Sequence, residues 1–315
     1  MTRRSLPYRI FIAVYLIIAY ILIFLFQDCP RVLFRRRKSI SGQVAVITGG
    51  AMGMGKEVAK RLAIEQNAKV CILDINEDQG ERTVAEIRAL GGIAKFYKVD
   101  ISNENALEDA AGQIENDPMF GFVSIVIANA AILKHGTVCD LTVEDYKFNN
   151  NVNYLGHIFT IKTFLGKMIE RQHGHIVSIG SICSHFGEAG GSAYCSAKFA
   201  ARGFIESLHG ELDDLGMTDK VILTSIYPYF VNTPFITNLQ EPHSTFWDIV
   251  PLDTASMEIV NAILYNRYTV FIPGSIKLLC VYMKWMTTLG TYPLGRKVFN
   301  IVCKPKAEEI ALKKV

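Results

Sequence analysis

Short apolar strings alternate with helical stretches along most of this 315-residue chain, and this alternation restricts the folds that residues 41–272 can form. Most of the strings are continuously apolar, as expected for strands that are covered on both faces of a sheet. The predicted strands are 44–48, 70–74, 94–99, 123–127, 176–178, 221–227 and 270–272. The predicted helices are 56–66, 78–90, 105–116, 143–171, 193–215 and 255–266. Parallel neighbours require crossover helices, and these crossovers are right-handed. The sequence therefore predicts an α/β fold, a Rossmann-type doubly wound parallel sheet of about seven strands.

A glycine-rich turn follows the first predicted strand and opens the first helix. It reads Thr48-Gly49-Gly50-Ala51-Met52-Gly53-Met54-Gly55. Glycines let such a turn adopt positive φ and let the backbone approach a pyrophosphate, which then lies on the N–H groups of the helix. The candidate cofactor-binding residues in this turn are Thr48, Gly49, Gly53, Met54 and Gly55.

An acidic residue, Asp74, ends the second predicted strand. A carboxylate at this place can accept hydrogen bonds from the adenosine ribose and would repel a 2′-phosphate, which favours NAD over NADP. Asp100, at the end of the third strand, would either contact the adenine edge or cap the next helix. Further cofactor contacts are predicted for Asn129, Ala130, Val231 and Thr233, which follow the fourth and sixth strands.

Three polar side chains are predicted to converge beside the nicotinamide. Tyr194 and Lys198 begin a predicted helix at positions i and i+4, which places them on one face. Ser181 follows the fifth strand, at the sheet edge where ligands bind. Lys198 and the positive nicotinamide would lower the pKa of the phenol from about 10, so that Tyr194 could take the proton of an alcohol. Ser181 would hydrogen-bond the carbonyl oxygen as it forms, Lys198 would also hold the nicotinamide ribose, and Asn153 would orient Lys198 through water.

An uncharged apolar run precedes the predicted domain. Residues 10–26 would form a helix about 25 Å long. Residues 1–40 carry eight Lys or Arg and one Asp, so the other 275 residues have a net charge of −4 within a total of +3. No small-x-small cleavage motif follows the run, and more basic residues lie after it than before it, which predicts an uncleaved anchor with the domain in the cytosol. Full spanning, a shallow hairpin and a lipid-surface anchor all remain open.

Cysteine and histidine show no metal-binding pattern. The seven cysteines are scattered without a C-x-x-C pair, and the seven histidines lack ligand spacing. Reduced thiols that act as small hydrophobic residues are the favoured interpretation. We therefore predict no metal site.

Taken together, these motifs resemble the short-chain dehydrogenase/reductase family. The resemblance covers residues 41 to about 272 and rests on the T-G-x-x-x-G-x-G turn, Asp74, Asn129-Ala130, Asn153, Ser181 and Tyr194-x-x-x-Lys198. It implies an Asn-Ser-Tyr-Lys tetrad and nicotinamide-dependent interconversion of alcohols and ketones. Strings such as 153–157 and 228–233 resemble the membrane- and lipid-droplet-associated branch that holds epidermal retinol dehydrogenases and 17-beta-hydroxysteroid dehydrogenases of types 11 and 13.

Two positions depart from the family pattern. Ala128-Asn129-Ala130-Ala131 stands where the family usually has N-N-A-G, which puts the hydrogen bonds after the fourth strand in doubt. Tyr229 replaces the usual glycine after Pro228, at the start of a segment to Trp247 that is expected to form a mobile apolar lid over the substrate.

Three parts are expected along the chain: a hydrophobic anchor over 1–40, the dehydrogenase domain over 41–272, and an extension over 273–315 that ends in a charged, frayed tail from Lys304. Residues 278–286 of this extension would lie at a membrane interface or pack against the core or a dimer partner. We expect an NAD-dependent dehydrogenase of hydrophobic alcohols, with retinoids or steroids as the leading substrate class. A homodimer at the endoplasmic reticulum membrane or a lipid droplet is expected, with no nucleic-acid partner. The alternative is a lipid-surface binding or scaffold protein that keeps the fold without turnover.

Overall fold

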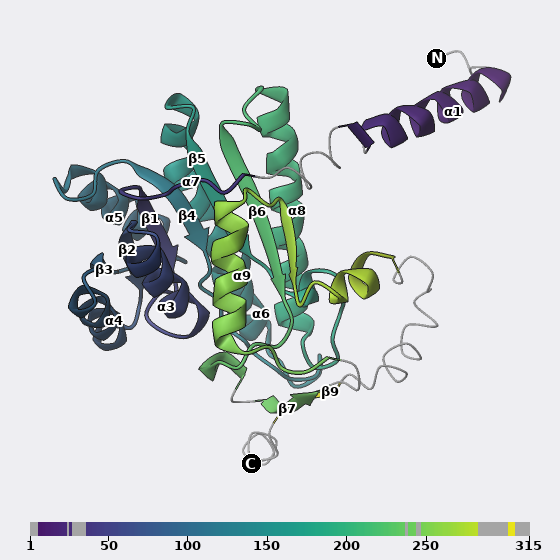
Figure 1. Ribbon diagram of the computed structural model, residues 1–315. Helices are drawn as coiled ribbons and strands as arrows, with labels where there is room; N and C mark the ends of the chain where they lie inside the picture. Colours follow the sequence, from purple (N-terminus) through teal and green to yellow (C-terminus); the bar gives the residue numbers. More distant parts are fainter. Residues whose placement is uncertain are drawn as a thin grey trace. The chain divides into compact units, whose positions relative to one another are not determined.

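Two compact units, Met1–Lys38 and Ser39–Val315, make up the computed structural model. The structure describes residues 6–23, 25–26, 36–236, 239–243, 247–282 and 302–305. The first unit holds helix α1 (Leu6–Ile23), drawn in purple in Figure 1. Among the described residues, no helix combines the length and the apolarity needed to cross a membrane. The anchor stays a prediction, and part of it, residues 1–5, 24 and 27–35, lies outside the described residues.

A sheet of seven parallel strands forms the centre of the second unit. In spatial order these are β3 (Ile93–Lys98), β2 (Lys69–Asp74), β1 (Val44–Thr48), β4 (Val123–Ala128), β5 (Gly174–Ile179), β6 (Val221–Pro228) and β8 (Thr269–Ile272). The order reverses between β1 and β4, and ligands of doubly wound sheets bind beyond the carboxyl ends of the strands at this point. The prediction of a doubly wound sheet of about seven strands is confirmed.

Helices cover both faces of this sheet (Figure 1). The helices α3 (Gly53–Lys60), α4 (Glu77–Ala89) and α9 (Leu252–Leu264) share one hydrophobic cluster, and α5 (Glu104–Asn116), α7 (Gly156–Glu170) and α8 (Ser192–Asp214) share the other. Strand β1 contributes Ala45 and Ile47 to the first cluster and Val44 and Val46 to the second. Successive strand side chains point to opposite faces, so a continuously apolar strand supplies both cores.

The long helix predicted over 143–171 contains a π-helical turn. Helix α6 (Val143–Asn150) passes into α7 through this turn at Asn151–Leu155. Such turns add a residue to the local repeat, are rare, and are frequent at functional sites. Asn153 within the turn and His157 just after it are both buried.

A second, antiparallel sheet was not predicted. It pairs β7 (Leu239–His243) with β9 (Val302–Pro305). The expectation of a frayed tail is therefore wrong for Lys304 and Pro305, while residues 306–315 lie outside the described part.

Part of the predicted lid belongs to the core instead. Tyr229 and Trp247 are buried, with ring centroids 6.4 Å apart, and the Trp247 indole donates to Ser275 Oγ at 3.1 Å. Residues 237–238 and 244–246 of the lid lie outside the described residues. In the extension, Cys280 is buried and Leu278 is exposed, so residues 278–281 place some side chains in the core and others at the surface. Residues 283–286 are also outside the described part.

Candidate active site

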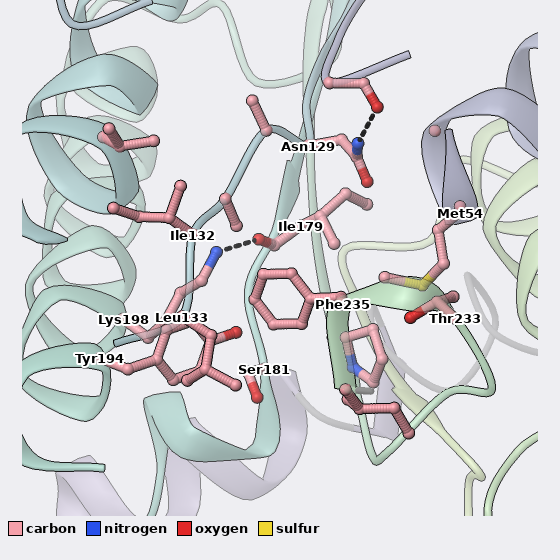
Figure 2. Close-up of a pocket in the computed structure, with 18 of the residues that line it drawn as sticks. Met54, Asn129, Ile132, Leu133, Ile179, Ser181, Tyr194, Lys198, Thr233 and Phe235 are labelled. Carbon is pink, nitrogen blue, oxygen red and sulfur yellow. Dashed lines mark hydrogen bonds between the residues drawn. The ribbon is translucent and has the colours of Figure 1, made fainter. Parts of the chain in front are cut away.

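A pocket of about 500 Å³ lies at the carboxyl ends of the central strands. Its walls come from the glycine-rich turn after β1, from the ends of β2 to β6 and from the start of α8. Tyr194, Lys198 and Leu133 occupy one side and Met54 and Thr233 the other (Figure 2). The pocket thus stands where the reversal of strand order predicts a ligand crevice.

The glycine-rich turn needs glycine at two positions for different reasons. Gly49 has a φ of +66°, and a Cβ there would approach Ala130 Cα to 2.7 Å. A Cβ on Gly55 would collide with the Gly49 carbonyl oxygen. The turn and the first residues of α3 therefore pack backbone against backbone, beneath the segment that follows β4.

Asn129 fastens this turn to the end of β4. Its side-chain amide donates to the carbonyl oxygens of Thr48 at 2.9 Å and Gly49 at 3.1 Å. The Thr48 hydroxyl in turn accepts the backbone N–H groups of Asn129 at 3.0 Å and Ala130 at 3.2 Å. The single asparagine of the Ala128-Asn129-Ala130-Ala131 segment thus supplies the hydrogen bonds that the departure from the family pattern had put in doubt.

Asp74 lies at the end of β2 and lines the pocket. Its two carboxylate oxygens accept the backbone N–H groups of Ala51 and Asn76, each at 3.0 Å. These bonds fix the carboxylate beside the glycine-rich turn, and its remaining lone pairs are available to ribose hydroxyls. Asp74 therefore lines the pocket beside the glycine-rich turn, and its contact with a ribose stays a prediction.

The other predicted cofactor residues also line the pocket, except Thr48, which is fully buried. Asp100 lines the pocket as well. Its carboxylate accepts hydrogen bonds from the backbone N–H of Ser102 at 2.9 Å and from the Ser102 hydroxyl at 2.7 Å, and these bonds stabilise a turn. The N-cap of α5 is Asn103 rather than Asp100. The remaining lining residues predicted for the cofactor are Met54, Asn129, Ala130, Val231 and Thr233.

Tyr194 and Lys198 stand one turn apart on the buried face of α8. The Lys198 ammonium is 5.8 Å from the centre of the Tyr194 ring and donates to the Ile179 carbonyl oxygen at 2.9 Å (Figure 2). Ser181, after the end of β5, and Tyr194 both line the pocket, and Ser181 acts to lower the pKa of the Tyr194 phenol. Tyr194, Lys198 and Ser181 are thus brought together as predicted.

Burial controls the proton affinity of these groups. It raises the pKa of Tyr194 well above the ordinary value, and Ser181 opposes this only in part. Burial also lowers the pKa of Lys198 to about 8. The sequence had predicted that Lys198 lowers the pKa of Tyr194, but the ammonium is bonded to Ile179 instead. The phenol is protonated in this arrangement, and its ionisation requires a further positive charge in the pocket.

The described contacts of Asn153 are with the wall that follows β4, and its predicted role of orienting Lys198 through water stays a prediction. Its amide is fully buried and makes two bonds with the backbone of Ile132, accepting from N–H at 2.9 Å and donating to C=O at 2.8 Å. A third bond joins it to the side chain of Asn149 at 3.1 Å. Asn153 therefore holds the pocket wall after β4 and makes no direct hydrogen bond to Lys198 in the described structure.

His157 also contacts the wall of the site, and the sequence did not predict this role. It is buried one turn beyond Asn153, and its Nε2 lies 3.0 Å from the Ala130 carbonyl oxygen. Burial, together with the charge of Lys198, lowers the pKa of His157 to about 3, so the imidazole is neutral and donates this bond. Its position four residues after Asn153 could have indicated this role, since residues at this spacing lie on the same face of a helix.

The arrangement fits a dinucleotide. Gly53 has a φ of +57°, and the atoms nearest to the position of a Cβ on it belong to Thr233, at 3.8 Å. The start of α3 is therefore open toward the pocket, with its N–H groups available to a pyrophosphate. Asp74 at one end and Tyr194 with Lys198 at the other would hold the two ribose units of NAD.

Comparison with known proteins agrees with this reading. The family described as short chain dehydrogenase matches residues 43–244. The chain is similar to 17-beta-hydroxysteroid dehydrogenase 13 of Homo sapiens, with 34% identity over 83% of this chain and 85% of that protein. Similarity to estradiol 17-beta-dehydrogenase 11 of Rattus norvegicus is 33%, over 80% of this chain and 82% of that one. Among solved structures, a short chain dehydrogenase/reductase from Burkholderia phymatum in complex with NAD has a TM-score of 0.71 at 20% identity. The match covers 80% of this chain and 97% of that one.

Proposed function

Because the chain belongs to the short-chain dehydrogenase family and is an NAD-dependent oxidoreductase of alcohol groups, we propose that its substrate is a bulky hydrophobic alcohol or the matching carbonyl compound. The hydroxysteroid and retinol classes are the leading candidates. Two of the similar proteins are named for hydroxysteroid or estradiol dehydrogenation, which supports the steroid class. Retinoids come from the resemblance in sequence alone.

The apolar walls around Tyr194 support a hydrophobic substrate. Phe235 stacks near Tyr194, with ring centroids 6.0 Å apart and planes tilted by 55°. Leu133, Phe148 and Ile182 also line the pocket. A wall of this composition binds a fused-ring or polyene body through burial of apolar surface and leaves orientation to a few polar groups.

Bound NAD supplies the hydride acceptor or donor, and the residues of the chain handle the proton. In the oxidative direction, Tyr194 Oη takes the hydroxyl proton of the alcohol, and in reduction it returns that proton. Ser181 donates a hydrogen bond to the substrate oxygen as the carbonyl forms. Lys198 would hold the nicotinamide ribose, and the positive charge of the oxidised nicotinamide beside the phenol would favour its ionised form. Asn153 and His157 keep the wall after β4 in place.

We further propose that the enzyme works at a membrane or lipid-droplet surface with its catalytic unit facing the cytosol. The uncharged run of residues 10–26 and its basic flanks support this, since a hydrophobic alcohol partitions into lipid and a tethered pocket meets it there. The endoplasmic reticulum is the proposed membrane.

The carrying observation is the Ser181–Tyr194–Lys198 cluster inside a dinucleotide pocket, and a variant of Tyr194 tests it. Tyr194→Phe removes only the phenol oxygen, so turnover of a retinol and hydroxysteroid panel should fall at least about 100-fold. NAD binding, followed by tryptophan fluorescence or calorimetry, should stay within a factor of about three. Membrane fractions of the full chain provide the enzyme, and NADH absorbance provides the rate.

Two outcomes would decide against this function. Undiminished activity of Tyr194→Phe would refute the proton-transfer role. Tight NAD binding without turnover of any alcohol in the panel would instead favour a lipid-surface binding or scaffold protein that keeps the dehydrogenase fold.

A further inference from the structure

A polar link outside the pocket joins the two elements that carry Ser181 and Tyr194. Arg202, on α8, donates through Nη1 to Nδ1 of His185 at 3.0 Å. His185 directly follows the 3-10 turn Ile182–Ser184 and is 5% exposed. Neither side chain is among the described residues that line the pocket, and neither has a part in the mechanism above.

The chemistry of the two groups fixes the direction of this hydrogen bond. A guanidinium is always protonated and has only donors, so the imidazole must accept at Nδ1. The neutral ring of His185 therefore carries its proton on Nε2. The same guanidinium donates through Nε to the Glu206 carboxylate at 2.6 Å, one turn further along α8. Bonds from two of its nitrogens thus hold Arg202 in one orientation.

Aromatic side chains of the sheet hold the ring of His185 from another side. Its centroid lies 4.5 Å from that of Tyr227 on β6, with the ring planes at 87°. It lies 5.1 Å from that of Phe271 on β8. Edge-to-face contacts of this kind restrict where a ring can lie. The imidazole therefore contacts both the sheet and α8, and it fixes the backbone that carries it.

The backbone from Ser181 to Phe186 is hydrogen-bonded within itself. The N–H of Ser184 donates to the Ser181 carbonyl oxygen at 2.8 Å, and Ser184 Oγ accepts the N–H of Ser181 at 3.3 Å. The N–H groups of His185 and Phe186 donate to the Ile182 carbonyl oxygen at 2.8 and 3.1 Å. A turn with these bonds moves as a unit, so a displacement of His185 also displaces the Ser181 hydroxyl.

On α8, the link continues the row of the proposed proton-transfer groups. Arg202 lies four residues after Lys198, and Lys198 lies four residues after Tyr194. Residues at this spacing are neighbours along one side of a helix. This side of α8 is joined to the end of β5 by the bond from Lys198 to the Ile179 carbonyl oxygen, and to the following turn by the bond from Arg202. Two bonds along one row restrict both the distance and the rotation of α8 relative to the turn.

We propose that Arg202 and His185 are positioning residues: their hydrogen bond holds the two hydroxyl groups of the mechanism at the separation that turnover requires. The link itself does not depend on the proposed function, whereas its effect on turnover rests on it. Proton transfer needs both oxygens within hydrogen-bond reach of the same substrate atom. Misplacement of such groups by about 1 Å can reduce turnover about 100-fold.

Variants that remove one partner test the link. Arg202→Met keeps much of the side-chain length and lacks the donors, and His185→Leu lacks the acceptor. In purified full chain, kcat for a responsive alcohol should fall at least about tenfold in each variant, while KM and NAD affinity stay within a factor of about three. Arg82→Met, at an exposed position on α4, is the matched control and should keep the wild-type kcat.

A conservative variant separates the hydrogen bond from the packing of the ring. Asparagine can present Oδ1 close to the place where histidine presents Nδ1. His185→Asn should therefore keep kcat within a factor of about three of the wild type, although it lacks the ring. An equal loss of kcat in His185→Asn and His185→Leu would overturn the proposal.

A double variant measures whether the two residues act through one bond. Either single variant already breaks that bond, so Arg202→Met combined with His185→Leu should be no more than about threefold slower than the slower single variant. Multiplication of the two single losses would show that the residues act independently, and this result would also overturn the proposal.

Hydrogen–deuterium exchange provides a readout that needs no turnover. The peptide that covers residues 181–186 should exchange at least about threefold faster in Arg202→Met than in the wild type or Arg82→Met, because its bonded N–H groups open more often once the link is lost. Unchanged exchange in this peptide would refute the link. If the chain turned over no alcohol, this comparison would still decide whether the link holds the turn, and only the catalytic consequence would fall with the proposed function.

Discussion

Buried titratable groups surround the proposed catalytic phenol, and burial favours the neutral form of each of them. Lys198 is 1% exposed and His157 is 1% exposed. Both have a lowered pKa because desolvation penalises the charged form. The Lys198 ammonium is therefore buried at a cost in folding stability. Such a cost is typical of residues that serve a functional site.

Replacing the buried ammonium should stabilise the fold while it removes activity. The pKa of Lys198 is lowered to about 8, so in the folded state its charged form is disfavoured by up to about 3 kcal/mol below that pH. Lys198→Met also leaves the Ile179 carbonyl oxygen unpaired, which costs about 1 kcal/mol. We expect the free energy of unfolding at pH 7 to rise by about 1–2 kcal/mol in urea titrations. Between pH 8 and 10.5 the wild type gains stability and the difference should shrink.

Lys147 provides the matched control for this measurement, because it is an exposed lysine on α6. Lys147→Met should change the free energy of unfolding by less than about 0.5 kcal/mol. A loss of stability in Lys198→Met at pH 7 would argue against a desolvated ammonium.

The imidazole of His157 should make the fold sensitive to acid. Its pKa is lowered to about 3 in the folded state, and the unfolded chain takes up the proton near pH 6.5. Stability is then complete above pH 6.5 and is lost as the pH falls, by about 1.4 kcal/mol per unit from this group. In urea titrations at several pH values from 6.5 to 4, the free energy of unfolding of His157→Gln should fall less steeply with decreasing pH, by about 1.4 kcal/mol per pH unit. His173→Gln, at an exposed position, should keep the wild-type slope.

Strands and helices were predicted closely where burial alone decides them. Strand β1 has the predicted bounds Val44–Thr48, because a short, continuously apolar string before a glycine-rich turn is typical of a buried strand. The π turn at Asn151–Leu155 was missed, since nothing in the local pattern marks the extra residue. The pairing of β7 with β9 depends on a contact between segments about 60 residues apart, and no periodicity encodes it.

In the candidate site, too, contacts within one element were predictable from the sequence, whereas contacts between elements were not. Tyr194 and Lys198 are neighbours on one helix face, so their spacing was enough to place them together. The partner of Asn153 is the backbone of Ile132, and the partner of Lys198 is Ile179. Both contacts cross from a helix to a strand end, so only the folded structure gives them. The site roles of these residues stay predictions until variants are measured.

The first turn of α3 offers a test of the backbone packing at the cofactor site. A Cβ on Gly55 would collide with the Gly49 carbonyl oxygen, so Gly55→Ala must displace the turn. We expect a loss of about 1–3 kcal/mol in stability and at least tenfold weaker NAD binding by calorimetry. Gly112→Ala on α5 is the control, because a Cβ there meets nothing within 4 Å. It should stabilise the protein by about 0.5–1 kcal/mol and leave NAD binding unchanged.

Division of the chain into the units Met1–Lys38 and Ser39–Val315 bears on how the protein is organised as a whole. The seven-stranded sheet and every proposed site residue belong to the second unit. The first unit contains α1 and most of the excess positive charge. We therefore expect catalysis and membrane attachment to be separable. The homodimer expected from the sequence stays a prediction.

A chain that begins at Ser39 should retain the cofactor site and lose attachment. NAD affinity should stay within a factor of about three of the full chain, because none of the pocket residues is removed. In flotation with phosphatidylcholine vesicles, the full chain should rise with the lipid and the shortened chain should remain at the bottom. Flotation of the shortened chain would move the attachment to the second unit.

The hydrogen bond between Trp247 and Ser275, with Tyr229 packed beside it, also affects how this enzyme could be re-engineered. These contacts join Tyr229 and Trp247, the two ends of the segment that was predicted as a lid, to each other and to Ser275 beyond β8. If this segment were replaced by that of a relative, the new residues would pack poorly in the interior unless Tyr229, Trp247 and Ser275 were exchanged together with it. Donor loops for altered selectivity should accordingly be chosen by their buried ends rather than by the residues that face the ligand.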